Sequence, residues 1–199
     1  MAAQAAPRLV TRQEYLQFER SAERRSEYHN GLLTSMAGAS PEHNIITANV
    51  ITQLSLQLQK RGCIAFASDL RLRVDACNAY FYPDVTVVCA EPVYEDLEGV
   101  RALQNATLIV EVLSDSTETR DRGEKWHCYQ TLDSLTTYVL IAQDRTRVEV
   151  FTRLDGGDWR LSTFQDPNMP AMLPAVGGEI RVGDLYAGIV VTNSTPEPG

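Results

Sequence analysis

The sequence YPDVTVVC at residues 82–89 and the sequence LIVEVL at residues 108–113 decide the fold. Both are short, apolar and rich in β-branched residues, which is typical of buried strands. Each carries one carboxylate, Asp84 in the first stretch and Glu111 in the second. An acidic side chain is almost never fully buried unless it is paired or binds a metal. Two acids on two buried strands therefore predict a site for a hard cation.

Glu111 carries the stronger local argument of the two acids. It interrupts a continuous apolar run between Val110 and Val112, where burial without a partner is costly. Asp84 follows Pro83, and an Asp in that position commonly belongs to a turn or to the start of a strand. Local sequence alone therefore favours a functional role for Glu111 more than for Asp84.

The length of 199 residues suits one domain with a full core. We expect a single domain at residues 8–190, with flexible termini at 1–7 and 191–199. No apolar run approaches the roughly 18 residues needed to span a membrane. The first seven residues also lack the pattern of a signal peptide. The expected location is the cytoplasm, without membrane association.

The four cysteines, Cys63, Cys77, Cys89 and Cys128, form no CxxC pair. Without a secretory signal, such scattered cysteines are expected to stay reduced. The net charge is −8, from 26 acidic and 18 basic residues. This balance argues against a general nucleic-acid coater, which needs a basic surface. It does not exclude a nuclease, because acids gathered at a metal site are neutralised by the ion.

Capping and turn signals predict the first half of the chain. Thr11 and Glu14 form a capping box for a helix whose buried side carries Tyr15, Leu16 and Phe18. Asn30-Gly31 predicts a hairpin between strands at 27–29 and 32–36. Ser40 and Pro41 start a long helix that ends at Gly62. Two long strands are expected next, at 63–74 and 80–89, with Arg71 and Arg73 on an open face.

Residues 90–105 are acidic and poorly patterned, so they are expected to form a loop or flap. A central strand at 107–113 and a helix at 118–132 follow, with Asp121, Lys125 and Tyr129 on one helix face. Further strands are expected at 136–142, 147–153, 159–164 and 179–182. The resulting fold class is α/β, with a central mixed β-sheet flanked by helices on both sides.

Six short motifs in this order resemble the Uma family, bacterial proteins described as restriction endonucleases of the PD-(D/E)XK nuclease superfamily. The motifs are Glu27-Tyr28 with Asn30-Gly31, the segment 37–44 (AGASPEHN), the segment 68–71 (SDLR), Tyr82-Pro83-Asp84, the segment 109–114 (IVEVLS) and the segment 121–125 (DRGEK). The resemblance extends from about residue 8 to residue 187. It implies a restriction-endonuclease-like fold, in which Pro83-Asp84 is the PD pair and Glu111 is the second acid.

The resemblance also implies a metal site. Asp84, Glu111 and the Val112 carbonyl would hold Mg²⁺, with Mn²⁺ as an alternative. The superfamily places its lysine two residues after the second acid, where this chain has Leu113. In the Uma pattern that lysine lies on the following helix, which assigns the role to Lys125.

Two further residues complete the site that the resemblance implies. Glu27 is the candidate for an acid that the superfamily often carries on an early helix near the metal. His43 lies in the first turn of the long helix, whose positive end favours phosphate. Tyr129, one turn after Lys125, would support that lysine, and Asp69 has no assigned role.

Plainer interpretations compete with each of these roles. Lys125 could simply pair with Asp121, a contact worth a few tenths of a kcal/mol on an exposed helix. His43 could be an ordinary hydrogen-bonding residue at a helix start, and Glu27 a solvated charge.

The sequence therefore leaves three functions open. The first is a Mg²⁺-dependent endonuclease that hydrolyses DNA phosphodiester bonds with a metal-activated water, as a homodimer. The second is a catalytically inactive or regulatory binding protein that keeps the nuclease fold. The third is a metal-dependent hydrolase of a small phosphate ester.

Overall fold

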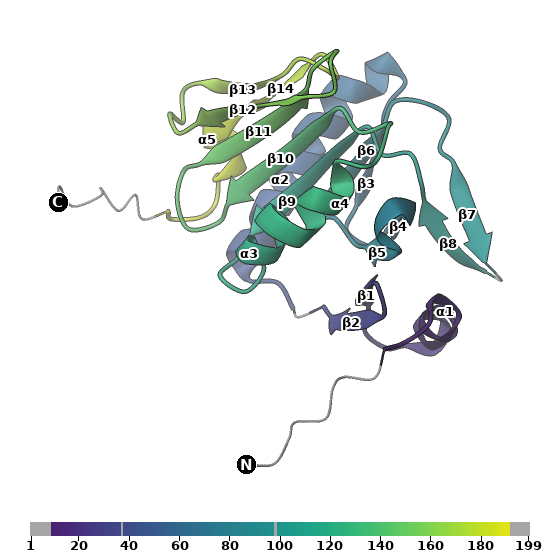
Figure 1. Cartoon of the computed structure of the whole chain (residues 1–199). Coiled ribbons are helices and arrows are strands. Elements are labelled where there is room, and N and C mark those ends of the chain that lie inside the picture. The colour runs from purple at the N-terminus through teal and green to yellow at the C-terminus, as the bar shows by residue number, and fades with distance from the viewer. Residues whose placement is uncertain (1–8, 37, 98, 192–199) are drawn as a thin grey trace.

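The strands of this protein form two large sheets, as the computed structural model shows for residues 9–36, 38–97 and 99–191 (Figure 1). Within these residues each sheet has six strands. The first has the order β2 (Leu32–Ser35), β1 (Ser26–His29), β5 (Ala79–Phe81), β4 (Leu72–Val74), β8 (Val100–Leu103) and β7 (Tyr94–Leu97). The second has the order β12 (Trp159–Phe164), β11 (Val148–Arg153), β10 (Thr137–Ala142), β9 (Leu108–Leu113), β6 (Val85–Val88) and β3 (Ile64–Ala67).

The helices cover both faces of the second sheet (Figure 1). One face carries α2 (Pro41–Leu58), which continues as the 3₁₀ turn η1 (Gln59–Arg61). The other carries α3 (Glu118–Arg120), the π-helical turn η3 (Asp121–Lys125) and α4 (Trp126–Tyr129). Helix α1 (Arg12–Ser21) packs on the first sheet, where the 3₁₀ turn η2 (Asp75–Cys77) links β4 to β5. A separate hairpin consists of β13 (Pro170–Leu173) and β14 (Gly178–Arg181), and the short helix α5 (Val182–Leu185) follows it. The α/β class with helices on both sides is confirmed, although one central sheet was expected. None of the helices in the described ranges has both the length and the hydropathy to span a bilayer.

Each of the two long strands expected at 63–74 and 80–89 divides between the two sheets. Strand β3 pairs with β6 in the second sheet, whereas β4 pairs with β5 in the first. The break between β5 and β6 falls at Tyr82-Pro83-Asp84. Pro83 has no N–H to give to a sheet ladder, which favours leaving one sheet and entering the other at this point. Asp84 therefore lies at the junction of the two sheets.

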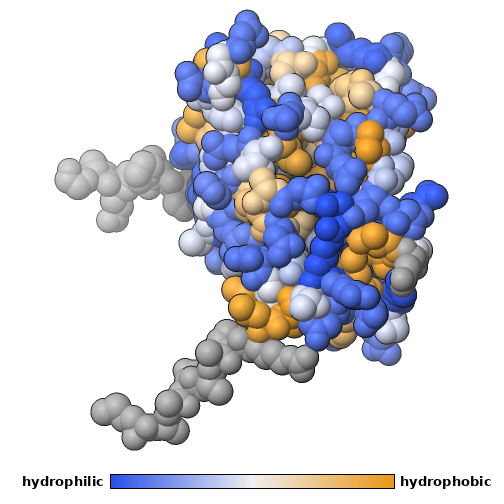
Figure 2. Space-filling view, turned by 45° about the vertical axis from the view of Figure 1, so that its right-hand side comes forward, coloured by the Kyte–Doolittle hydropathy of each residue, from blue (hydrophilic) through white to orange (hydrophobic). Residues whose placement is uncertain are grey.

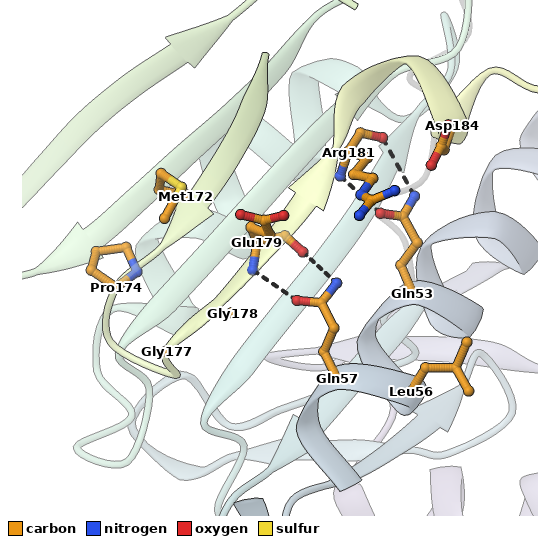
Figure 3. Close-up of a pocket in the computed structure, with 10 residues that line it drawn as sticks. All are labelled: Gln53, Leu56, Gln57, Met172, Pro174, Gly177, Gly178, Glu179, Arg181 and Asp184. Atoms are coloured by element: carbon orange, nitrogen blue, oxygen red, sulfur yellow. Dashed lines mark hydrogen bonds between the residues drawn. The ribbon is translucent and has the colours of Figure 1, made fainter. Parts of the chain in front are cut away.

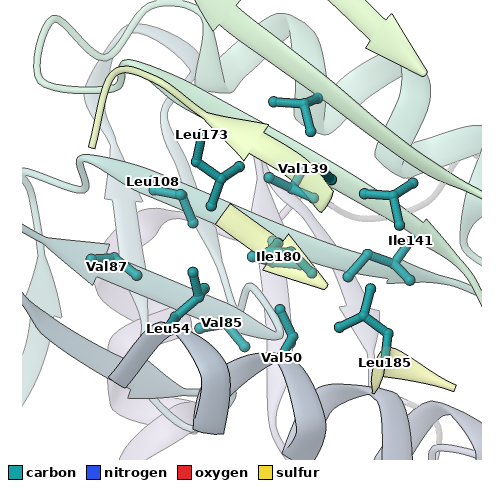
Figure 4. Close-up of a cluster of buried hydrophobic side chains, with 14 of the residues drawn as sticks. Val50, Leu54, Val85, Val87, Leu108, Val139, Ile141, Leu173, Ile180 and Leu185 are labelled. Carbon is teal, nitrogen blue, oxygen red and sulfur yellow. The ribbon is translucent and has the colours of Figure 1, made fainter. Parts of the chain in front are cut away.

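Strand β9 separates two hydrophobic cores. Its side chains alternate, so Leu108 (Figure 4), Val110 and Val112 face the α2 core, while Ile109 and Leu113 face the α4 core. All six residues of β9 are buried, including Glu111. Because it lies between Val110 and Val112, Glu111 points towards α4 and away from the α2 core.

Helix α2 is organised by a strict spacing of four residues. Ile46, Val50, Leu54 and Leu58 are its buried residues, and they form one stripe against the sheet. The Ser40 hydroxyl accepts a hydrogen bond from His43 N, which confirms the predicted N-cap. The helical segment ends at Gly62, whose φ of 75° is the left-handed conformation that glycine adopts readily.

Two glutamines on α2 bind the outer edge of β14 as a neighbouring strand would (Figure 3). Gln57 accepts from Glu179 N at 3.1 Å and donates to Glu179 O at 2.9 Å. Gln53 does the same with Arg181, at 2.8 Å and 3.4 Å. A cavity of about 580 Å³ lies beside this contact and is lined by Gln53, Leu56, Gln57, Met172, Pro174, Gly177, Gly178, Glu179, Arg181 and Asp184.

Several local expectations are confirmed. Thr11 and Glu14 form the capping box of α1. The β1–β2 hairpin turns through Asn30 and Gly31, with φ of 46° and 95°, as its turn type requires. Helix α1 buries Tyr15 and Leu16 but leaves Phe18 50% exposed, so the expectation for Phe18 is wrong.

Other expectations are wrong for the region between α1 and β9. Within the expected loop at 90–105, β7 and β8 pair as antiparallel strands. Arg71 lies buried, with Nη2 2.8 Å from Glu19 Oε2, instead of on an open face. Arg73 is also paired, with Glu95 and Asp75. Of the termini expected to be flexible, 1–7 and 191–199, all residues except 191 lie outside the described ranges.

The expectation of four reduced thiols is wrong in this structure. Cys63 is bonded to Cys89, and Cys77 is bonded to Cys128. The first disulfide joins neighbours, because the β3–β6 register pairs Ile64 with Val88 one residue away. The second joins η2 to α4 across 51 residues of sequence. Sequence spacing alone shows neither pairing.

Leu54→Ala should lower the free energy of unfolding by about 2–5 kcal/mol, because it leaves a cavity at a fully buried position. Leu56→Ala on the same helix is the control. Leu56 is 69% exposed, so its loss should change stability by about 0.5 kcal/mol or less. Urea unfolding followed by circular dichroism measures both. Equal effects would contradict the placement of α2.

Candidate active site

Asp84 and Glu111 lie opposite each other at the end of the β6–β9 ladder. The antiparallel register pairs Val85 with Val110, so one further step brings Asp84 opposite Glu111. Val85 faces the α2 core, and therefore Asp84 points to the other side, as Glu111 does. The Val112 N–H donates to Asp84 Oδ2 at 2.7 Å and ties Asp84 to β9.

His43 joins Asp84 from the first turn of α2. Its Nε2 lies 2.9 Å from Asp84 Oδ1. The side chains of His43 and Asp84 are 16% and 14% exposed, so they form the solvent-facing side of the cluster. Burial lowers the pKa of His43, but the hydrogen bond and charge of Asp84 outweigh it, and the net pKa is raised.

Lys125 is surrounded by three carboxylates. Its Nζ lies 3.1 Å from Glu27 Oε1, 3.1 Å from Glu111 Oε1 and 3.0 Å from Asp121 Oδ1. The lysine side chain is only 8% exposed. Burial lowers the pKa of Lys125, but its three acidic neighbours outweigh burial and raise the pKa above its ordinary value. Lys125 is therefore a protonated, buried cation at neutral pH.

Glu27 reaches this cluster from β1 in the first sheet. Its Oε1 accepts from Tyr82 N at 3.1 Å, directly beside the junction that carries Asp84. Its Oε2 is bound by Arg120, which also donates to Glu124 at 2.8 Å. Glu27 is 4% exposed, so the plainer interpretation of a solvated charge does not hold for it.

A π-helical turn supplies both Asp121 and Lys125. The structure assigns η3 to Asp121–Lys125, between α3 and α4, within the single helix expected at 118–132. Such insertions are rare and occur frequently at functional sites. The turn still brings Asp121 Oδ1 and Lys125 Nζ together, as the shared helix face predicted. Tyr129 follows on α4, and its hydroxyl donates to Glu111 Oε1 at 2.9 Å.

Asp121 is the acid to which sequence reasoning gave no function. It is 1% exposed and contributes the third carboxylate around Lys125. Its place in the DRGEK motif, four residues before Lys125, was the available signal. The spacing alone suggests only a surface pair, because spacing on a helix does not show burial.

Glu111 is the most strongly perturbed acid of the site. Burial raises its pKa well above the ordinary range, Lys125 opposes this, and the charges of Asp121, Asp84 and Glu27 raise it further. Burial also raises the pKa of Asp121. Three carboxylates contact Lys125, Arg120 pairs with the second oxygen of Glu27, and Asp84 adds a fourth acid nearby, so the cluster favours either an added proton or an added metal ion.

The structure thus brings together Glu27, His43, Asp84, Glu111 and Lys125, the five residues predicted for catalysis. Val112 lies beside Asp84 through its N–H, and its carbonyl as a metal ligand stays a prediction. Leu113, which stands where the superfamily has its lysine, is 3% exposed and packs in the α4 core. Asp69 lies in the turn between β3 and β4 and takes part in none of the site contacts given above.

Replacing Glu111 by glutamine should stabilise the metal-free protein more at pH 8 than at pH 5. A carboxyl whose folded pKa is raised stabilises the fold fully below its unfolded pKa, near 4.5, and loses this as pH rises through the folded pKa. Raising the folded pKa by one pH unit changes the free energy of unfolding by about 1.4 kcal/mol. Urea unfolding in chelator across this pH range measures the difference. A gain in the variant that is independent of pH would contradict the raised pKa.

The chain is similar to known proteins over most of its length. Residues 12–183 match the model of the Uma2 family, described as "putative restriction endonuclease". The uncharacterized protein sll1609 of Synechocystis is 37% identical over 164 residues, which are 82% of this chain and 92% of that protein. The uncharacterized protein slr1290 of the same organism is 30% identical over 177 residues, covering 89% and 91%.

A solved structure shares the fold. The crystal structure of a protein from Anabaena variabilis, described as a putative nuclease belonging to DUF820, superposes with a TM-score of 0.73 at 19% identity. The match covers 89% of this chain and 98% of that one. At this level of identity the likeness concerns the fold alone. Together with the family match over 12–183, it shows that the chain belongs to the Uma2 family and has a nuclease-like α/β fold.

Proposed function

We propose that this protein is a Mg²⁺- or Mn²⁺-dependent endonuclease that hydrolyses DNA phosphodiester bonds. The observation that carries the proposal is the convergence of Asp84, Glu111 and Lys125 at one junction of two sheets. The family match supports a nuclease-like role. The metal, the DNA substrate and the roles of single residues are part of the proposal.

The donor set fits a hard divalent cation. Asp84 and Glu111 offer carboxylate oxygens, which Mg²⁺ and Mn²⁺ prefer, and the Val112 carbonyl would add a third oxygen. The raised pKa of Glu111 supports this, because a cation beside Asp84 and Glu111 would relieve the repulsion among the buried acids. The bound ion would supply Lewis acidity at the scissile phosphate and a water of lowered pKa.

The residues of the chain would then bind and orient the substrate. His43 lies at the N-terminal end of the long helix α2, where N–H groups and the helix dipole favour a phosphate. The Lys125 ammonium would stabilise negative charge that develops on the phosphate. Tyr129 and Lys125 together hold Glu111 Oε1, which fixes that carboxylate for its role as a ligand.

One observation favours an inactive or regulatory binding protein that keeps the fold. Lys125, Glu27, Glu111 and Asp121 are all buried, and Lys125 is fully engaged by three acids. A lysine in this position could simply stabilise the acids in the interior. The nicking experiment below separates this function from catalysis. We also propose a cytoplasmic location.

Asp84→Asn should weaken binding of Mg²⁺ or Mn²⁺ by about ten-fold or more, because it removes one of two anionic ligands. Isothermal titration calorimetry measures the change. Asp144→Asn is the matched control, since Asp144 is an exposed acid in the turn after β10. Equal affinity in wild type and Asp84→Asn would refute the metal site.

Wild-type protein should nick supercoiled plasmid DNA in Mg²⁺ or Mn²⁺, and Lys125→Ala should lower the rate by about 100-fold or more. The chain has only one other lysine, Lys60, which is exposed in η1 and gives the control Lys60→Ala. An unchanged rate in Lys125→Ala would remove that residue from the mechanism. Metal binding without nicking would favour the regulatory function or a smaller phosphate-ester substrate.

We also propose that two copies form a homodimer through β2. This edge strand exposes Leu32 and Leu33 by 46% and 38%. Figure 2 shows exposed hydrophobic surface at the end of the molecule where β1 and β2 lie. Edge strands with exposed apolar side chains readily pair with another chain.

Sedimentation velocity should show a dimer for wild type and a monomer for Leu33→Glu. The control Leu56→Glu, at a 69% exposed site on α2, should stay dimeric. A monomeric wild-type protein would refute the dimer, and a dimeric Leu33→Glu would place the interface elsewhere.

A further inference from the structure

The disulfide Cys77–Cys128 has a histidine beside it and an active-site helix attached to it. The Sγ atoms of Cys77 and Cys128 and a ring nitrogen of His29 all lie within 4.8 Å of one another. His29 Nε2 is 3.8 Å from Cys128 Sγ, and His29 Nδ1 is 3.1 Å from Glu124 Oε2. Neither the metal site nor the proposed hydrolysis uses any of these groups.

The two cysteine residues differ in their exposure to solvent. Cys128 is 1% exposed, whereas Cys77 is partly exposed in the short turn η2. An external thiolate can therefore approach Cys77 more readily than Cys128. The sulfur that would leave is that of Cys128, beside His29. With its Nδ1–H donated to Glu124, His29 would present an Nε2–H to the departing thiolate as the imidazolium, which stabilises that thiolate and lowers the barrier to exchange.

Cys128 is also close to the site along the chain. It immediately precedes Tyr129 and follows Lys125 by three residues, and both of these contact Glu111. The helical segments there are short, since α3, η3 and α4 have three, five and four residues. Short helices depend on tertiary contacts for their stability. The disulfide is a covalent tether of this segment to η2, which precedes β5 and the junction carrying Asp84.

We propose that Cys77–Cys128 is a thiol-exchange site, through which a dithiol reductant releases the segment 118–132 that holds Lys125 and Tyr129. A thiolate of the dithiol attacks Cys77 Sγ, a mixed disulfide forms, and the Cys77–Cys128 bond breaks. Cys128 leaves as a thiolate and takes up a proton. The second thiol of the reductant then displaces Cys77, so that the reductant becomes a disulfide and both cysteines become thiols. Disulfides in a reducing compartment are usually transient or redox-sensing, which agrees with such a cycle.

The test is hydrogen–deuterium exchange of the full chain with and without dithiothreitol, with the state of each cysteine read by alkylation and mass spectrometry. Opening of Cys77–Cys128 should accelerate exchange in 118–132 by about ten-fold or more, because local unfolding becomes easier there. Exchange in α2 should stay the same. This readout needs no metal and no DNA, so it is independent of the proposed nuclease function.

Two double variants separate the disulfides. Cys63→Ser with Cys89→Ser keeps only Cys77–Cys128 and should respond to dithiothreitol as wild type does. Cys77→Ser with Cys128→Ser should exchange fast in 118–132 already without reductant and show no further response. If the latter variant fails to fold, the former still gives the answer.

Three results would overturn the proposal. The first is unchanged exchange in 118–132 although Cys77 and Cys128 are alkylated. The second is an equal response to dithiothreitol in the variant that lacks this disulfide. The third is equal acceleration in α2, which would show that the whole protein loosens.

The role of His29 has its own test. His29→Asn should slow the opening of Cys77–Cys128 by dithiothreitol about ten-fold and leave the opening of Cys63–Cys89 unchanged. Equal rates of opening in wild type and His29→Asn would exclude a role for His29.

Discussion

The ammonium group of Lys125 is the charge on which the centre of this molecule depends. Glu27 comes from the first sheet, Glu111 from the second, and Asp121 from the π-helical turn, and all three lie within 3.1 Å of Lys125 Nζ. Buried carboxylates without a cation would be very costly, so Lys125 stabilises the meeting of the two sheets and the helix, with Arg120 as a second cation at Glu27. The same contacts join the three elements and leave the acids crowded.

The junction at Tyr82-Pro83-Asp84 positions the groups around the cluster of Lys125 and its acids. The chain leaves β5 of the first sheet and enters β6 of the second within three residues. Tyr82 N binds Glu27, while Asp84 binds His43 and Val112. One short segment therefore connects groups from β1, α2 and β9, and a change in the angle between the sheets would alter the distance between Glu27 of the first sheet and Glu111 of the second.

Local signals predicted much of this fold, because they act within a few residues. The capping box at Thr11, the turn at Asn30-Gly31 and the N-cap at Ser40 all lie where the pattern placed them. The division of the long strands between two sheets was missed, since an apolar run looks the same in either sheet. The disulfides were missed because their partners are adjacent only after folding.

The candidate site divides in the same way. Glu111 could be predicted because it interrupts an apolar run. The ordered set of family motifs predicted Asp84, Lys125, Glu27 and His43. Asp121 and Arg120 were not recognised, because their roles arise from burial and from contact with another sheet. A helix spacing reports which residues share a face, but not what covers that face.

The two glutamines of α2 show how a helix can set the position of a strand. Residues four apart on a helix rise by about 6 Å, and residues two apart on a strand by about 6.7 Å. Gln53 and Gln57 therefore match Arg181 and Glu179 closely enough to bind both peptide groups of each. A slip of β14 by one residue would break four hydrogen bonds and turn buried Ile180 outward. Helix α2 thus fixes the register of the β13–β14 hairpin. It also covers the outer edge of β14, to which another chain could otherwise add a strand.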